Sequence, residues 1–125
     1  MKIKNLDGTD GYLDIRPSQF PLRSEGSSKS KLQYECGQKL KQLFPFHVIL
    51  EEIAIPRERL FIDFFIPTLR IAVEVHGVQH DKFVKHFHGS KAGFKASQER
   101  DSRKKEWCRV NNIELYEVYT PEDLS

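Results

Sequence analysis

FIDFFI (residues 61–66) and RIAVEVHG (residues 70–77) are apolar stretches in which acidic residues interrupt expected β-strands. An unpaired carboxylate in a low-dielectric core costs several kcal/mol, so acids inside strands are usually ion-paired, hydrogen-bonded or bound to a metal. A hairpin that closes at residues 68–69 would set Asp63 directly opposite Glu74, with their Cβ atoms about 5 Å apart. The sequence therefore predicts that these two carboxylates meet, since a slip of one residue would send them to opposite faces of the sheet.

Side-chain alternation predicts which residues accompany the acids. Phe61 and Phe65 are expected on the face of Asp63, and His76 on the face of Glu74.

The hard oxygens of the two carboxylates suit Mg²⁺ or Mn²⁺, and the backbone carbonyl of Val75 could fill a further coordination position. A structural role is the alternative for either acid, in which Asp63 or Glu74 forms an ion pair with Arg70 or a nearby lysine.

A coarse reading of the periodicity gives the element order α-β-β-β-α-β. The expected elements are a helix at 32–44 with Ser30 as its N-cap, strands at 47–53, 61–66 and 70–77, a helix at 94–110 and a strand at 113–119. Residues 1–30 are rich in turn formers and are expected to be an extended or flexible arm, with 31–125 as the folded domain. A DNA-tracking role for this arm is a less favoured alternative.

The spacing from Asp63 through ten residues to Glu74-Val75-His76 resembles the signature of the PD-(D/E)XK nuclease superfamily. His76 stands where that signature usually has Lys, and Ile62 where it often has Pro. The longer pattern over residues 62–80 is similar to the branch of very-short-patch repair endonucleases and EDxHD-type phage and homing endonucleases. Residues 98–105 and 111–113 extend the resemblance, which covers about residues 32–119.

This resemblance implies an α/β, restriction-endonuclease-like αβββαβ core with a mixed β-sheet flanked by helices. The implied activity is metal-dependent hydrolysis of DNA phosphodiester bonds with Mg²⁺ or Mn²⁺ as cofactor. Asp63 and Glu74 would be metal ligands, and His76 or His80 the base toward water or a hydrogen-bond donor to phosphate. Glu35, on the first helix, would join the metal shell through water, although an exposed structural acid is equally expected there.

The segment from Lys82 to Lys105 is basic, with eight Lys/Arg and two acids, and carries interleaved aromatic residues. Such a segment is typical of a surface that binds DNA phosphates, although a solvated amphipathic helix gives the same pattern. Its expected DNA-binding residues are Lys82, Lys85, His86, His88, Lys91, Lys95, Arg100, Arg103 and Lys104. Gln98, Asp101 and Lys105 recur at helical spacing on one face and are accessory candidates for the site.

The composition, with 30% charged residues and a net charge of +2, is that of an ordinary globular domain. Cys36 and Cys108 are far apart in sequence and are expected to be reduced core thiols. We expect DNA as the partner, a cytoplasmic location, no membrane and no small-molecule cofactor, and leave a homodimer open.

Two other functions remain open from the sequence. One is a catalytically inactive DNA-binding module of the same fold. The other is a zinc hydrolase using His76, His80, His86 and His88, although the pattern lacks the Glu of HExxH.

Overall fold

The computed structural model describes residues 1–77 and 91–124, without the side chain of Lys91. Its elements are β1 (Lys2–Lys4), β2 (Asp10–Tyr12), α1 (Lys31–Leu43), β3 (Leu50–Ile55), β4 (Leu60–Ile66), η1 (Pro67–Leu69), β5 (Ile71–Val75), α3 (Lys91–Val110), β6 (Glu114–Val118) and η3 (Pro121–Leu124). Among the predicted site residues, His80, Lys82, Lys85, His86 and His88 lie outside the described residues.

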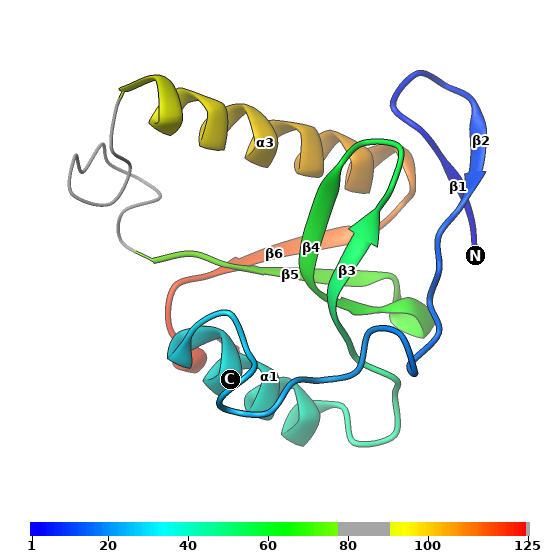
Figure 1. Ribbon diagram of the computed structural model, residues 1–125. Helices are drawn as coiled ribbons and strands as arrows, with labels where there is room; N and C mark the ends of the chain where they lie inside the picture. The colour runs from blue at the N-terminus through cyan, green and yellow to red at the C-terminus, as the bar shows by residue number, and fades with distance from the viewer. Residues whose placement is uncertain (78–90, 125) are drawn as a thin grey trace.

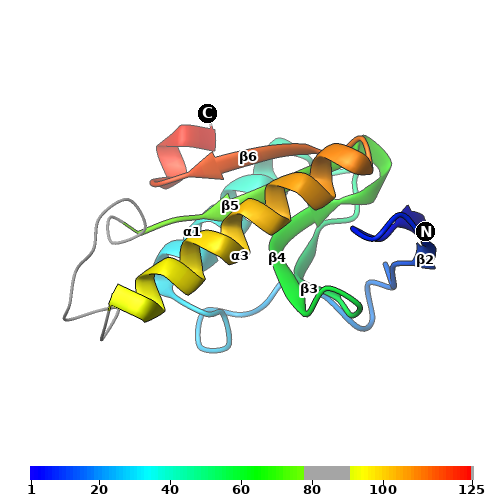
Figure 2. The same cartoon turned by 90° about the horizontal axis from the view of Figure 1, so that it is seen from above.

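The main sheet is mixed and has the strand order β3-β4-β5-β6. β3, β4 and β5 pair antiparallel, whereas β6 pairs parallel to β5 after the chain has crossed over through α3. Helix α3 covers one face of the sheet, and α1 with η3 covers the other (Figures 1 and 2). The predicted α/β class and the element order from α1 to β6 are therefore confirmed, while membership in the nuclease fold stays a prediction. Within the described ranges, no helix combines the length and apolarity that crossing a membrane requires.

The β4–β5 hairpin has the register that the sequence predicts. Phe64 pairs with Val73 and Ile66 with Ile71, and continuing this register sets Asp63 opposite Glu74. The turn is η1, closed by Arg70 in the left-handed conformation with φ 51°. The Arg70 guanidinium donates a hydrogen bond to the carbonyl of Asn111 at 2.7 Å.

Helix α1 begins where its cap predicts. The Ser30 hydroxyl accepts the Gln33 N–H at 3.0 Å, which satisfies one of the free donors of the first turn. The following strand starts later than predicted, at Leu50, because residues 44–49 form a turn region after α1.

Two apolar clusters fill the space on either side of the sheet. Trp107 and Cys108 of α3 pack with Ile62 and Phe65, among others. On the other face, the cluster includes Cys36, Leu40, Phe64 and Val73. Burial raises the pKa of Cys36 to about 11 and of Cys108 to about 12, so the two free thiols stay protonated at neutral pH, in keeping with their predicted place in the core.

Strict alternation does not hold along β4. Ile62 and Phe65 belong to the same cluster, although their spacing would place them on opposite faces of a regular strand. Glu52 of β3 falls opposite Asp63 in the register of these two strands. Its backbone has a φ of 52°, which distorts the β3–β4 pairing at this position. Phe61 is consequently half-exposed whereas Phe65 is buried, so these two residues do not share the environment that alternation predicts.

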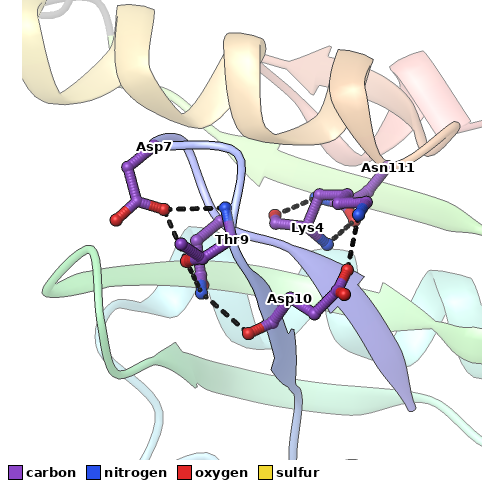
Figure 3. A network of polar contacts seen from close by, with 6 residues as sticks. Lys4, Asp7, Thr9, Asp10 and Asn111 are labelled. Carbon is purple, nitrogen blue, oxygen red and sulfur yellow. Dashed lines mark hydrogen bonds and ion pairs between the residues drawn. The ribbon is translucent and has the colours of Figure 1, made fainter.

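The first residues differ from the flexible arm that their composition predicts. β1 and β2 pair as a small antiparallel hairpin, and Ile3 and Leu13 are buried in the cluster beneath α3. Asn111, after the end of α3, holds β1 with its amide side chain, which accepts the Lys4 N–H at 2.7 Å and donates to the Lys4 carbonyl at 3.0 Å (Figure 3). This hairpin is ordered because it buries apolar side chains and satisfies backbone groups against a segment more than a hundred residues away in sequence.

Candidate active site

Asp63 on β4 and Glu74 on β5 are buried side by side and fix each other through the backbone. Glu74 Oε2 accepts the N–H of Asp63 at 2.8 Å, and Asp63 Oδ2 accepts the N–H of Val75 at 2.8 Å. Both carboxylates are under a tenth exposed. The reciprocal bonds hold the two acids in one orientation on the face of the sheet that α3 covers.

Lys104 of α3 reaches the same acids. Its Nζ lies 2.6 Å from Glu74 Oε1, and the ammonium is largely buried. Burial disfavours the charged ammonium, but the nearby acids, Glu74 first and then Asp63 and Asp101, together outweigh this effect and raise the pKa of Lys104. The sequence predicts Lys104 on an outer surface that binds DNA. In the structure its side chain instead lies inside the site, paired with Glu74.

The electrostatics of the acid pair favour a proton or a cation. Burial, and next the nearby Glu74 carboxylate, raise the pKa of Asp63 to about 7, while the Val75 N–H, Lys104 and Lys29 oppose this rise. Two neighbouring negative charges repel each other strongly in a medium of low dielectric constant. At neutral pH Asp63 is therefore only partly ionised, and a bound cation would favour its full ionisation.

This shift predicts how the free energy of unfolding depends on pH. A carboxyl whose pKa is higher in the folded than in the unfolded protein binds more protons when folded, so its contribution is full below about pH 4 and is lost as the pH rises to about 7. Urea titrations from pH 4 to pH 8 should show this decline in the wild type and a smaller one in Asp63→Asn. Equal pH profiles for the two proteins would contradict the raised pKa.

A cavity of about 390 Å³ opens beside the acids. Its walls come from the start of α1 with the preceding Lys29, from the β4 and β5 strands, and from α3. The lining residues include Lys29, Ser30, Gln33, Asp63, Glu74, Val75, His76, Asp101 and Lys104. Lys29, Lys104 and the N-terminus of α1 thus border the same space of small-molecule size as the carboxylates.

His76 follows β5 and is held by Glu117 of β6. The Nε2 atom of His76 lies 3.1 Å from Glu117 Oε1, and because a carboxylate accepts, this nitrogen carries the hydrogen. Lys105 approaches the same Glu117 oxygen at 3.6 Å. The His76 side chain also borders the acid cavity, so it does share the cleft with Glu74 as predicted.

A second cavity of about 400 Å³ lies on the other side of His76. It is lined by His76, Gln98, Asp101, Ser102, Lys105, Glu117 and Tyr119. The three predicted accessory residues of α3, Gln98, Asp101 and Lys105, therefore do share one helical face, and all of them border this cavity.

Other predicted residues lie away from the site. Glu35 is exposed on α1, where its carboxylate lies 4.0 Å from Lys31, and it does not line either cavity. Lys95 and Arg100 are exposed on α3, and Arg103 donates to the carbonyl of Glu58 at 2.5 Å.

Gln33 and Glu117 also line the two cavities, although neither is predicted from the sequence. Gln33 shares the buried face of α1 with Cys36, Gly37 and Leu40, and this spacing of three and four was the available signal. Its amide donates to Glu51 Oε2 at 2.9 Å and to Glu52 Oε1 at 3.0 Å, so it ties the start of α1 to β3. Glu117 had no comparable signal, because its partner His76 is 41 residues away in sequence.

The side chains near Asp63 and Glu74 decide how the expected Mg²⁺ or Mn²⁺ ion could be bound. Within residues 1–77 and 91–124, no group of three or more His, Cys, Asp or Glu side chains is arranged to hold a metal ion. Mg²⁺ nevertheless usually binds through one or two carboxylates, with water and substrate phosphate filling the other positions. Asp63 and Glu74 fit that mode, and Lys104 would have to share Glu74 Oε1 with the ion.

Comparison with known proteins gives two viral relatives of unassigned activity. "Uncharacterized protein 307L" of Invertebrate iridescent virus 6 is 46% identical over 66 residues, which make up 52% of this chain and 34% of that protein. "Uncharacterized protein 033L" of Invertebrate iridescent virus 3 is 33% identical over an alignment of 106 residues, and the match covers 78% of this chain and 55% of that protein. The chain thus spans about a third to about half of the length of these relatives. No protein-family model and no solved structure matches the chain.

Proposed function

We propose that this protein is a metal-dependent DNA endonuclease that hydrolyses phosphodiester bonds by attack of an activated water. The observation that carries this proposal is the pair of buried carboxylates, Asp63 and Glu74, fixed side by side with Lys104 at one wall of an open cavity. Paired acids and a lysine beside a cavity suit phosphodiester hydrolysis, and a purely structural ion pair needs no cavity.

Mg²⁺ or Mn²⁺ bound by Asp63 and Glu74, with the Val75 carbonyl as a further ligand, would neutralise phosphate charge and lower the pKa of a water. Lys104 would place its ammonium beside the scissile phosphate. Lys29 and the N-terminus of α1, which face the same cavity, would bind the remaining phosphate oxygens.

His76 would donate a hydrogen bond to phosphate or take a proton from the attacking water. Its pairing with Glu117 keeps the ring orientation fixed and favours one tautomer. Glu117 is therefore a positioning residue for the imidazole.

DNA would be bound outside the cavity by the exposed basic residues of α3. Lys95 and Arg100 are the described candidates, because their side chains face solvent. Their contribution would be to neutralise phosphates, and binding should weaken as salt is raised.

The proposal is tested by incubating the protein with supercoiled plasmid and short duplexes in Mg²⁺, in Mn²⁺ and in EDTA. We expect nicking or cleavage with either metal and none in EDTA, since without the cation two carboxylates would repel the phosphate and leave its developing charge unstabilised. Isothermal titration of the protein with Mn²⁺ gives a readout that does not depend on cleavage.

An inactive DNA-binding module of the same fold is the second candidate. It is favoured by the Lys104 ammonium, which already neutralises Glu74 in the position that a metal ion would share. DNA binding that persists in EDTA, with no cleavage in Mg²⁺ or Mn²⁺, would support this candidate over the enzyme.

A further inference from the structure

The cavity beside Asp63 and Glu74 and the cavity beside Tyr119 adjoin each other, and both are lined in part by α3. His76 and Asp101 border both of them, so these two side chains form the wall that the cavities share. Each cavity measures about 400 Å³. One nucleotide placed across this wall could put its phosphate into one cavity and its base into the other.

The side chains of the two cavities differ in a way that assigns these two parts. The first cavity holds the acid pair Asp63 and Glu74 together with Lys29, Lys104 and the N-terminus of α1, so a cation and the phosphate that it binds are favoured there. Asp101 borders both cavities and does not distinguish them, whereas Glu117 and Lys105, 3.6 Å apart, border the second one alone. Among the described residues that line it, the second cavity has no such acid pair, and its carboxylates can accept hydrogen bonds from the amino groups of a neutral base.

The second cavity also offers an aromatic surface. Tyr119, after the end of β6, is 40% exposed, and its ring centroid lies 5.6 Å from that of His76. Gln98 and Ser102, on the α3 side of the same cavity, provide amide and hydroxyl groups that can both donate and accept. An aromatic ring with polar groups around it is the usual arrangement for binding a single nucleobase.

We infer that the second cavity receives one unpaired nucleobase next to the scissile phosphate. This inference rests on the proposed nuclease function and narrows its substrate to DNA with an unstacked base, such as a single strand, a bulge or a mismatch. A base inside a regular duplex has both faces covered by its neighbours and presents only its edge in a groove, so it cannot lie against Tyr119 until it leaves the stack.

The experiment measures binding in EDTA, so that cleavage plays no part. The probes are three labelled oligonucleotides of equal length: a duplex with one unpaired adenine, the same duplex with an abasic residue at that position, and a fully paired duplex. The wild type should bind the unpaired adenine tightest. Tyr119→Ala should weaken that binding about 5- to 150-fold, the loss expected for one stacked base, and bring it to the level of the abasic probe.

Tyr116→Ala is the matched control. Tyr116 is a similarly exposed tyrosine on β6, but it lines a separate apolar cavity with residues of α1 and η3. Its removal should leave the preference for the unpaired base unchanged, and Tyr119→Phe should keep most of that preference because the ring remains.

Equal affinity of the wild type for the adenine and abasic probes, or no measurable binding to any probe, overturns the inference. An equal loss of the preference in Tyr116→Ala and Tyr119→Ala overturns it as well. The proposed nuclease activity is judged separately by cleavage in Mg²⁺, so the enzyme can stand when the base cavity fails.

Discussion

Replacing Glu74 with glutamine is expected to lower Mg²⁺-dependent cleavage about a thousandfold or more. The amide can still accept the Asp63 N–H, so the strand geometry is kept, but the negative charge that holds the cation is lost. A metal ion contributes several kcal/mol of charge stabilisation in such reactions, and each 1.36 kcal/mol corresponds to about a tenfold change in rate. The rate is measured at saturating Mg²⁺ on the labelled DNA that the wild type cleaves fastest, and Mn²⁺ affinity is followed by calorimetry.

Glu106→Gln is the control for this substitution. It makes the same chemical change on an exposed acid of α3 whose partner is Arg109 and which lines neither of the two cavities. We expect its cleavage rate to stay within about twofold of the wild type, because exposed ion pairs contribute little to stability.

Glu74→Gln leaves the buried Lys104 without its counter-charge, and the variant could fail to fold for that reason. The double variant Glu74→Gln/Lys104→Met removes both charges and separates the two effects. A folded Glu74 variant that cleaves within about tenfold of the wild-type rate would reject the nuclease assignment.

The meeting of Asp63 and Glu74 could be predicted because only local rules decide it. Alternation along each strand and the length of the turn at residues 67–70 fix which residues stand opposite each other. Helix α1 was equally accessible, since its cap and its apolar spacing are both local signals.

The rest of the site depends on contacts between distant segments, for which one sequence carries no signal. Lys104 meets Glu74, and Glu117 meets His76, only because the crossover through α3 brings β6 beside β5. The amino-terminal hairpin was missed for the same reason, since its partner Asn111 lies 107 residues away from Lys4.

Trp107→Ala is expected to have the largest effect on stability, lowering the free energy of unfolding by about 3–5 kcal/mol. Trp107 is 1% exposed and packs among the apolar side chains between α3 and the sheet. Truncation leaves a cavity that neighbours from several elements cannot fill together. Urea denaturation monitored by circular dichroism measures the loss.

Trp107→Phe tests which part of the indole matters. Among the described residues, the Trp107 Nε1 atom has no hydrogen-bond partner, so phenylalanine removes a buried donor without breaking a bond. Trp107→Phe should lower the free energy of unfolding by about 1–2 kcal/mol because ring volume is lost, which is clearly less than the effect of Trp107→Ala. Phe46→Ala, on a side chain that is 95% exposed, should change the stability by less than about 0.5 kcal/mol.

The position of Trp107 also links packing to the site. It lies one helical turn from Lys104, so the indole anchors the part of α3 that carries the ammonium to Glu74. Trp107→Ala should therefore lower cleavage even at temperatures where the protein stays folded, whereas Trp107→Phe should not. A Trp107→Ala protein as stable as Phe46→Ala would show that the cluster beneath α3 does not hold this helix in place.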